Sequence, residues 1–206
     1  MLARGEGPLV EAFRRFGVLP AKWRAPGLTP VEWADRAALL GPATLAVHCN
    51  YLADSDIAIL AKRKTSVVYC PKSHAFFGHP RHPLPRLMDA GVNVCLGTDS
   101  LASNDGLDLL EEMAQARDAC LSVVPSALFA AASGAAGRFV GAPAPLGRIE
   151  PGFAADMTAL WPRERWQAPP ANSAIGMEKA ESALSRLLEK NAIERRLGIA
   201  GGVMIA

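Results

Sequence analysis

The chain has 206 residues, half of them apolar, which is enough for one sizeable core and fits one domain or a domain with an appendage. Lys and Arg total 22 against 20 for Asp and Glu, a balance that gives no electrostatic reason to expect nucleic acid or a membrane as partner. No apolar stretch approaches the roughly 18 residues of a membrane span, and the first residues lack a secretory signal, so we expect a cytoplasmic protein.

The first segments of the chain predict two amphipathic helices. Residues 6–19 have the apolar spacing of a short helix, and residues 28–41 carry a stronger signal of the same kind. In the second segment Thr29 and Glu32 have the spacing of a capping box, and Gly41 ends the predicted helix. The sheet is therefore expected to begin after residue 41.

Three short apolar runs, each too brief for a helix, then predict buried strands at 43–49, 65–70 and 92–97. Helices are predicted between and after these strands, at 54–64, 84–91, 107–120 and 126–141. Continuously apolar strands that alternate with helices indicate a parallel sheet covered on both faces. The fold is either an α/β barrel or a doubly wound sheet.

Polar side chains gather where these strands end. They are His48, Asn50, Ser73, His74, Thr98, Asp99 and Ser100. The carboxyl edge of a parallel sheet is where ligands bind in both architectures, so we expect a site there. Asp99 needs a partner, because a charge at the mouth of a buried strand is costly unless it is paired, hydrogen-bonded or bound to a metal.

The last part of the chain has a different pattern. Residues 146–165 contain alternating short apolar segments, which indicate a few strands outside the main sheet. Residues 166–206 begin with a Pro-rich linker and continue as an amphipathic helix that we expect to stop at Gly198. The apolar stripe of this helix fits core packing or a contact between subunits.

Two kinds of residue have both a structural and a chemical interpretation. The cysteines lie singly, with no C-x-x-C pair, and are expected to be free buried thiols: Cys49, Cys70, Cys95 and Cys120. His48 alone could be a core histidine bonded to a neighbouring carbonyl. If His48 meets Asp99 at one mouth, however, imidazole and carboxylate together are the ligands and proton carriers of a zinc or iron hydrolase.

Three stretches resemble one known family: "LAVHCNYL", "VVYCPKSHAFFGHPRHPLPRLMDAGVNVCLGTDSLASNDGLDLLEEM" and "PLGRIEPGFAADMTAL". They look like the C-terminal half of the amidohydrolase superfamily, in its branch of deaminases and chlorohydrolases, over residues 7–160. The resemblance implies a (β/α)8 TIM-like barrel of which this chain holds strands six to eight. Residues 1–145 would then be a partial barrel, followed by the remnant of a small β appendage and the C-terminal helix.

The resemblance also implies roles for two residues. Asp99 resembles the strand-eight aspartate that binds the metal and takes a proton from the metal-bound water. His48 resembles the strand-six histidine, which holds the attacking water or the tetrahedral intermediate in mononuclear members and ligates a second metal in binuclear ones. The implied cofactor is a divalent metal, with zinc the first choice and iron or manganese alternatives. The implied reaction is hydrolytic deamination of an aminated heterocycle through a metal-bound hydroxide.

The loop after the second strand is expected to shape a pocket for a heterocyclic small molecule. We assign substrate contacts to Ser73, His74, His79 and Ser103. Phe76 or Phe77 could stack on the ring. The alternatives are that the segment 79–82 is a solvated loop and that Ser103 merely helps to start the next helix. Adenosine-like nucleosides, guanine-like bases and chlorinated triazines are all compatible with this pocket.

The chain departs from the family pattern in its histidine motifs and in its tail, which after residue 165 is a predicted linker and helix rather than the family's usual closing strands. The family has an H-x-H pair on strand one and a histidine on strand five, which in the deaminases is followed three residues later by a glutamate; neither motif occurs here. Two hypotheses follow. The chain is a fragment or half of a metal-dependent deaminase, inactive alone, whose partner is the missing N-terminal half or a second copy. Alternatively, it is a non-catalytic α/β domain for binding or assembly.

Overall fold

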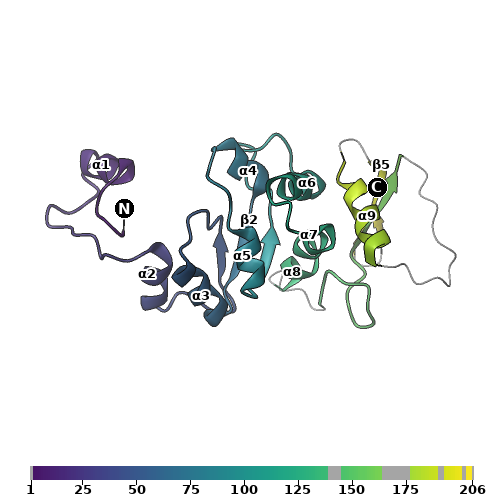
Figure 1. Cartoon of the computed structure of the whole chain (residues 1–206), viewed down its shortest axis with the longest axis horizontal. Helices are drawn as coiled ribbons and strands as arrows, with labels where there is room; N and C mark the ends of the chain where they lie inside the picture. The colour runs from purple at the N-terminus through teal and green to yellow at the C-terminus, as the bar shows by residue number, and fades with distance from the viewer. Residues whose placement is uncertain (1, 139–144, 164–176, 190–192, 201–202, 206) are drawn as a thin grey trace.

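A three-stranded parallel sheet lies at the middle of the chain (Figure 1). The computed structural model describes residues 2–138, 145–163, 177–189, 193–200 and 203–205. The strands are β1 (Leu45–Val47), β2 (Ser66–Tyr69) and β3 (Val94–Leu96), in the order β1-β2-β3. Both strand pairs are parallel, so the predicted α/β class with a parallel sheet is confirmed.

The helices of this part of the chain are α1 (Pro8–Arg15), α2 (Pro30–Arg36), α3 (Asp54–Arg63), α4 (Pro71–Phe76), α5 (Leu84–Asp89), α6 (Leu109–Ala119), α7 (Pro125–Ala132) and α8 (Gly134–Gly137). The sequence did not predict α4, and the single helix predicted at 126–141 is divided into α7 and α8 by a break at Ser133. None of the helices that the structure describes is long and apolar enough to cross a membrane.

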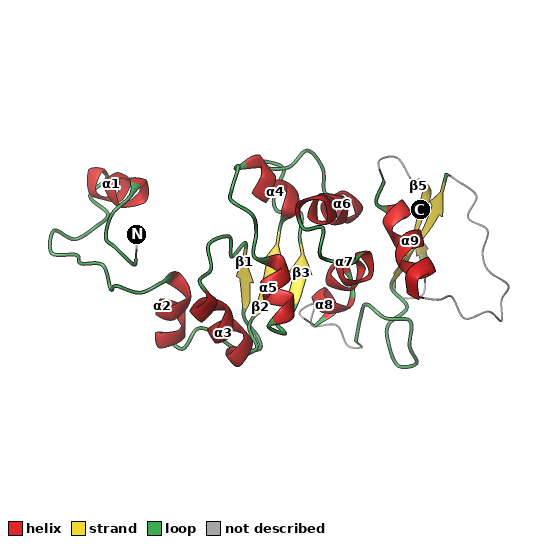
Figure 2. Cartoon of the chain, viewed as in Figure 1, coloured by secondary structure: helices red, strands yellow, loops and turns green. Residues whose placement is uncertain are grey.

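The core lies on one face of the sheet. The helices α3 and α5 connect successive neighbouring strands, and right-handed crossovers that step across a sheet in one direction place their helices on the same face. Figure 2 shows α5 lying across the sheet. On this face Val67, Val94 and Leu96 are buried in one cluster with Leu84 and Leu87 of α5.

The opposite face is more open, particularly along β1. The register pairs Val47 with Val68 and Val68 with Cys95, so these side chains share that face. Leu45 and Val47 of β1 are 41% and 53% exposed. The prediction of a buried strand covered on both faces is therefore wrong for β1. The physical reason is that β2 is the main contact of β1 among the described elements, whereas β3, the other edge strand, is also covered by α7 and α8.

Local signals in the sequence fix the start of α2. Thr29 Oγ1 accepts from the Glu32 amide at 3.1 Å, and Glu32 accepts from the Thr29 amide at 2.8 Å, so the predicted capping box is confirmed. Thr29 also donates to the buried Asp56, which ties α2 to α3. The helix ends at Arg36 rather than near Gly41, and Ala38 follows with a left-handed φ of 56°.

The C-terminal part contains a second sheet, and its first strand, β4 (Met157–Pro162), lies within the residues 146–165 for which strands outside the main sheet were predicted. The helix α9 (Met177–Leu187) confirms the start of the expected amphipathic helix, but residues expected to continue it form β5 (Ile193–Ala200). That strand pairs antiparallel with β4 and with β6 (Val203–Ile205). The pairing of β5 with β4 spans a long sequence separation and so leaves no local signal. The predicted linker at 166–176 lies outside the described residues.

The open face of β1 predicts self-association of the chain when it is expressed alone. Replacing Val47 by Lys places a charge on the exposed edge strand, which should lower the mean mass measured by light scattering after size-exclusion chromatography. Leu121→Lys is the matched control, because Leu121 is 82% exposed in the turn after α6, away from β1. A monomeric wild-type chain, or an equal effect of both variants, would contradict this interpretation of the open face.

Candidate active site

His48 and Asp99 lie at the carboxyl ends of the two outer strands. The His48 amide donates to the Val68 carbonyl at 2.8 Å, and the Gly97 amide donates to the Tyr69 carbonyl at 2.9 Å. Hydrogen bonds to β2 therefore continue past the ends of β1 and β3. A Cβ on Gly97 would lie 2.9 Å from Val68 Cγ1, so this close approach to β2 requires glycine.

The backbone turns both side chains toward each other. His48 and Asp99 have φ values of 67° and 58°, in the left-handed region that few residues other than glycine adopt. Strands separated by one neighbour lie roughly 10 Å apart. Nevertheless His48 Nε2 and Asp99 Oδ2 are 3.9 Å apart. The prediction that these two side chains converge at one mouth is confirmed, and strained backbone of this kind is typical of functional sites.

Two hydroxyls hold the Asp99 carboxylate. Ser73 Oγ donates to Oδ2 at 2.8 Å and Ser103 Oγ donates to the same oxygen at 3.2 Å. The Ser73 hydroxyl holds the pKa of Asp99 below its ordinary value; the Ser100 amide, Ser103 and His48 act in the same direction, while partial burial opposes them. Asp99 is therefore ionised at neutral pH. Substrate contacts by Ser73 and Ser103 stay a prediction, and in the structure both hydroxyls are bonded to Asp99.

His74 is buried behind this edge. Its Nε2 donates to the Pro80 carbonyl at 2.8 Å, and its Nδ1 lies 3.0 Å from Asn50 Oδ1. Burial lowers the pKa of His74, so the neutral ring donates one hydrogen bond, to Pro80, and packs beside Asn50, which follows β1. A substrate contact by His74 stays a prediction.

His79 belongs to an aromatic group at the surface. Its Nδ1 is 2.7 Å from the Tyr51 hydroxyl, and the two rings meet edge to face with centroids 5.4 Å apart. The ring centroids of Phe77 and His79 are 5.8 Å apart. Both Phe76 and Phe77 are exposed. Tyr51 belongs to this group although the sequence did not predict a role for it. Its signal is position alone, three residues after His48 at the end of a strand.

His82 is a structural residue that the sequence did not reveal. It is 3% exposed and stacks on Tyr69 with centroids 3.8 Å apart, and its Nε2 donates to the carbonyl of His48 at 2.8 Å. This bond supports the left-handed turn at His48. Within the described part of the chain its Nδ1 is buried without a hydrogen-bond partner. Burial lowers the pKa of His82 to about 4, so the ring is neutral near pH 7.

A buried carboxylate, Glu112, also escaped the sequence analysis. Glu112 is fully buried in α6 and accepts from the Lys72 amide at 2.9 Å and from Asn104 Nδ2 at 2.5 Å. Burial raises the pKa of Glu112, and these two donors oppose that shift. A Glu in an amphipathic helix ordinarily indicates a solvated face, so no local signal distinguished it.

The described residues contain no group of three or more His, Cys, Asp or Glu side chains that could hold a metal ion. His48 and Asp99 are thus two donors of suitable type and less than a complete set, since a catalytic zinc site normally has three protein ligands. The cysteines contribute no such site. All four are free, as predicted, but only Cys70, Cys95 and Cys120 are buried, whereas Cys49 is partly exposed. Burial raises the pKa of Cys70 to about 11.

Comparison with known proteins gives one family. A protein-family sequence model with the description "Amidohydrolase family" matches residues 21–183. The chain is 37% identical over 171 residues to a 5'-deoxyadenosine deaminase of Methanothermobacter thermautotrophicus, covering 77% of this chain and 39% of the relative. It is 36% identical over 156 residues to a 5-methylthioadenosine/S-adenosylhomocysteine deaminase of Moorella thermoacetica, covering 70% of this chain and 35% of the relative.

Solved structures of deaminases are similar to this chain as well. An adenosine deaminase from Xanthomonas campestris with bound zinc superimposes with a TM-score of 0.70 at 26% identity, covering 87% of this chain and 40% of that one. The E. coli guanine deaminase, at 21% identity and a TM-score of 0.65, covers 84% of this chain and 41% of its own and shows the same fold. The chain therefore spans about two fifths of the length of these proteins.

The burial of neutral His82 predicts a pH-dependent stability. Its pKa is about 4 in the folded chain against 6.5 when unfolded, so the unfolded state binds more protons between these values. The free energy of unfolding should therefore fall by roughly 3 kcal/mol as pH drops from 6.5 to 4. The free energy of unfolding at each pH is measured by urea unfolding, at protein concentrations too low for the chain to associate.

The control variant is His82→Phe, which keeps a ring on Tyr69 and removes the titrating group. Its stability should decline less steeply than that of the wild type across the same interval. Carboxylates with lowered pKa values lose their contribution to the free energy of unfolding mainly below about pH 4. They therefore do not mask the difference in slope between the wild type and His82→Phe. Equal slopes for the two chains would show that His82 does not titrate as its burial requires.

Proposed function

The chain belongs to the amidohydrolase family, and from this premise we propose that it carries part of the active site of a hydrolytic deaminase acting on an aminated heterocycle. The observation that carries the proposal is the pair of left-handed residues, His48 and Asp99, brought within 3.9 Å at the carboxyl edge of a parallel sheet. We assign β1, β2 and β3 to strands six, seven and eight of a (β/α)8 barrel. Their sequential order is the winding that a barrel requires.

The donor types at this edge fit a divalent metal, zinc before iron or manganese. His48 offers an imidazole nitrogen and Asp99 an ionised carboxylate, and both are ligands that zinc accepts. When bound, such a cation supplies Lewis-acid activation of water near neutral pH. The remaining ligands would come from residues other than those that the structure describes, because these contain no group of three candidate ligands.

The residues of this chain would then carry the proton transfers. Asp99 is ionised at neutral pH, so its carboxylate can accept a proton from the attacking water and pass it to the leaving amine. Where His48 does not ligate the cation, its Nε2 can instead hold the attacking water by a hydrogen bond. The hydroxyls of Ser73 and Ser103 keep the Asp99 carboxylate oriented while the proton moves.

The proposed substrate is an adenosine-like nucleoside or a purine base. The printed names of the deaminase relatives support this class. The aromatic group of Tyr51, Phe76, Phe77 and His79 supports it as well, because exposed rings beside a polar edge can stack on a heterocycle while His79 supplies a hydrogen bond. We therefore assign the predicted substrate contacts of His79 to this group.

The proposed partner is the remainder of an amidohydrolase barrel. The matched relatives are more than twice as long as the segment they share with this chain. The free edge of β1 and the exposed Leu45 and Val47 are the surfaces that a preceding barrel strand would cover. On this account the described residues alone do not perform deamination. A second copy of the chain is the other occupant that would bury the same surfaces.

A non-catalytic role in binding or assembly is the second candidate. One observation favours it: only two donors of the expected metal site lie together among the residues with described positions. In that case the sheet edge would be an inherited scaffold. The experiment below separates the two candidates, because assembly without turnover is the result that the second one predicts.

The test co-expresses the chain with the N-terminal half of a related deaminase and measures ammonia release from adenosine and 5'-deoxyadenosine. Asp99→Asn keeps the shape of the side chain but removes its charge and its capacity as a base. Turnover should fall at least ~10²-fold. His48→Asn should also be severely impaired, and the chain alone should show no turnover.

Asp89→Asn is the matched control for this test. Asp89 is the exposed last residue of α5, near the amino end of β3, so the same chemical change there should leave turnover unaltered. Near-normal rates in Asp99→Asn would remove the catalytic assignment. A stable complex that releases no ammonia would favour the assembly role.

A further inference from the structure

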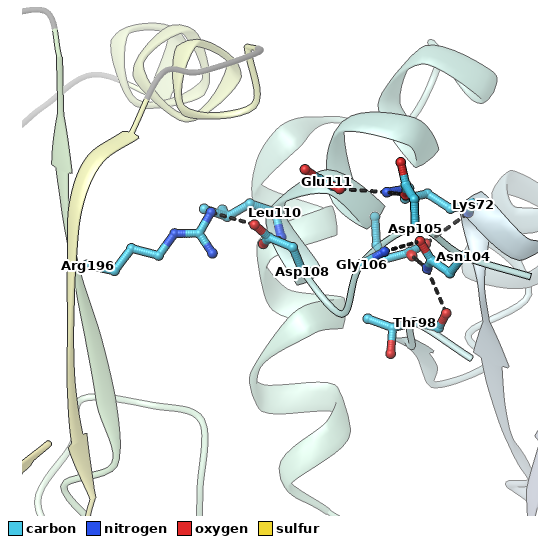
Figure 3. A network of polar contacts seen from close by, with 10 residues as sticks. Lys72, Thr98, Asn104, Asp105, Gly106, Asp108, Leu110, Glu111 and Arg196 are labelled. Carbon is cyan, nitrogen blue, oxygen red and sulfur yellow. Dashed lines mark hydrogen bonds and ion pairs between the residues drawn. The ribbon is translucent and has the colours of Figure 1, made fainter. Parts of the chain in front are cut away.

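The loop that carries Asp99, residues 97–108, is closed from behind by one amide side chain. Asn104 Nδ2 donates to the Thr98 carbonyl at 2.8 Å (Figure 3). The same nitrogen also donates to Glu112 Oε1, at 2.5 Å. Asn104 Oδ1 accepts from the Gly106 amide at 3.3 Å. One side chain therefore joins both ends of the loop and fixes the peptide directly before Asp99.

Glu112 anchors this closure to the helices on either side. Its second oxygen accepts from the Lys72 amide at the start of α4, at 2.9 Å. Lys72 Nζ in turn pairs with Asp105 of the loop and with Glu111 of α6, the latter at 2.6 Å. A buried carboxylate is stable only while its donors are in place, so the position of α6 and the conformation of the loop depend on each other.

The start of α6 is held by a residue from the far end of the chain. Asp108 Oδ1 accepts from the Leu110 amide at 2.9 Å and so caps the helix. Asp108 Oδ2 accepts from Arg196 Nη2 at 2.6 Å, and Arg196 lies on β5 of the C-terminal sheet. Figure 3 shows this arginine reaching across to Asp108. Asp108 lies one turn before Glu112, and the Asp108 carbonyl accepts a hydrogen bond from the Glu112 amide.

We propose that Arg196 is a positioning residue for the Asp99 loop. It binds Asp108 and thereby holds the turn of α6 whose Glu112 orders Asn104 and Thr98. The C-terminal sheet is thus coupled to the candidate active site although none of its described side chains belongs to that site. The inference rests on the proposed function only in giving Asp99 a catalytic role, since the contacts themselves do not depend on that role.

Other contacts of the C-terminal segment provide a comparison. Arg117 Nη1, near the last turn of α6, donates to the Ser185 carbonyl of α9 at 3.2 Å. Glu181 of α9 accepts from the Ser126 amide at the start of α7 at 3.0 Å. These bonds attach α9 to parts of the molecule other than the Asp99 loop. Removing one of them loosens the C-terminal segment without acting on Asp108.

The test is amide hydrogen exchange on the full chain, which reports the free energy of local opening. Three amides report the closure: Lys72 bonded to Glu112, Ser103 bonded to Ser100, and Gly106 bonded to Asn104. Arg196→Ala should speed exchange at these amides about two- to five-fold, the range expected for losing a partly exposed ion pair. Arg196→Lys should restore much of the protection, and Arg117→Ala should leave the three amides unchanged.

A second background isolates the ion pair from the helix cap. Asp108→Asn keeps an oxygen for the Leu110 amide but removes the charge that Arg196 binds. In that background Arg196→Ala should add no further increase in exchange. The inference is overturned if Arg196→Ala leaves exchange at the three amides unchanged or if Arg117→Ala accelerates their exchange equally. It is also overturned if the effects of Arg196→Ala and Asp108→Asn on exchange are additive. None of these outcomes requires turnover, so absence of deamination would count against the proposed function alone.

Discussion

The central strand β2 is the constraint on which the candidate site depends. It pairs in parallel with β1 on one side and β3 on the other, and its last carbonyls accept from His48 and Gly97 beyond the ends of those strands. The ladder therefore fixes where both outer strands stop. Only after these stops does the backbone enter the left-handed region that turns His48 and Asp99 together across the end of β2. A shift in either register would separate the two side chains.

Two carboxylates near this edge illustrate how their surroundings divide structural and chemical tasks. Asp99 is partly exposed and receives hydroxyl donors that hold its pKa below the ordinary value, which suits an anionic ligand and proton acceptor. Glu112 is fully buried, and burial raises its pKa; its donors are an amide of α4 and Asn104. Glu112 thus serves the architecture behind the site. The same side-chain chemistry has two roles because burial and partners differ.

Local patterns in the sequence predicted much of this arrangement. The capping box at Thr29 and Glu32 needs only four consecutive residues, and the convergence of His48 and Asp99 follows from the rule that parallel strands end at one edge. The openness of β1 could not be predicted in this way. Whether an apolar strand is covered depends on what packs against it, and its three residues look the same in either case.

Long-range contacts explain the other differences. The strand β5 pairs with β4 across more than thirty residues, and its sequence "IERRLGIA" can continue a helix equally well. Glu112 accepts a hydrogen bond from Lys72, forty residues away in the sequence, and Arg196 donates to Asp108 across a sequence separation of 88 residues. Each of these pairs consists of residue types that ordinarily face solvent. Their importance comes from tertiary placement, which neither composition nor periodicity records.

The central claim is that His48 and Asp99 together contribute to one divalent metal site. Anomalous diffraction at the zinc absorption edge, on crystals of the chain assembled with the N-terminal half of a related deaminase, tests it most directly. The account predicts one zinc peak at about 2.0–2.2 Å from an Asp99 carboxylate oxygen and adjacent to His48 Nε2, as ligand or through one water. A zinc peak bound elsewhere, with Asp99 still occupied by Ser73 and Ser103 alone, would contradict it.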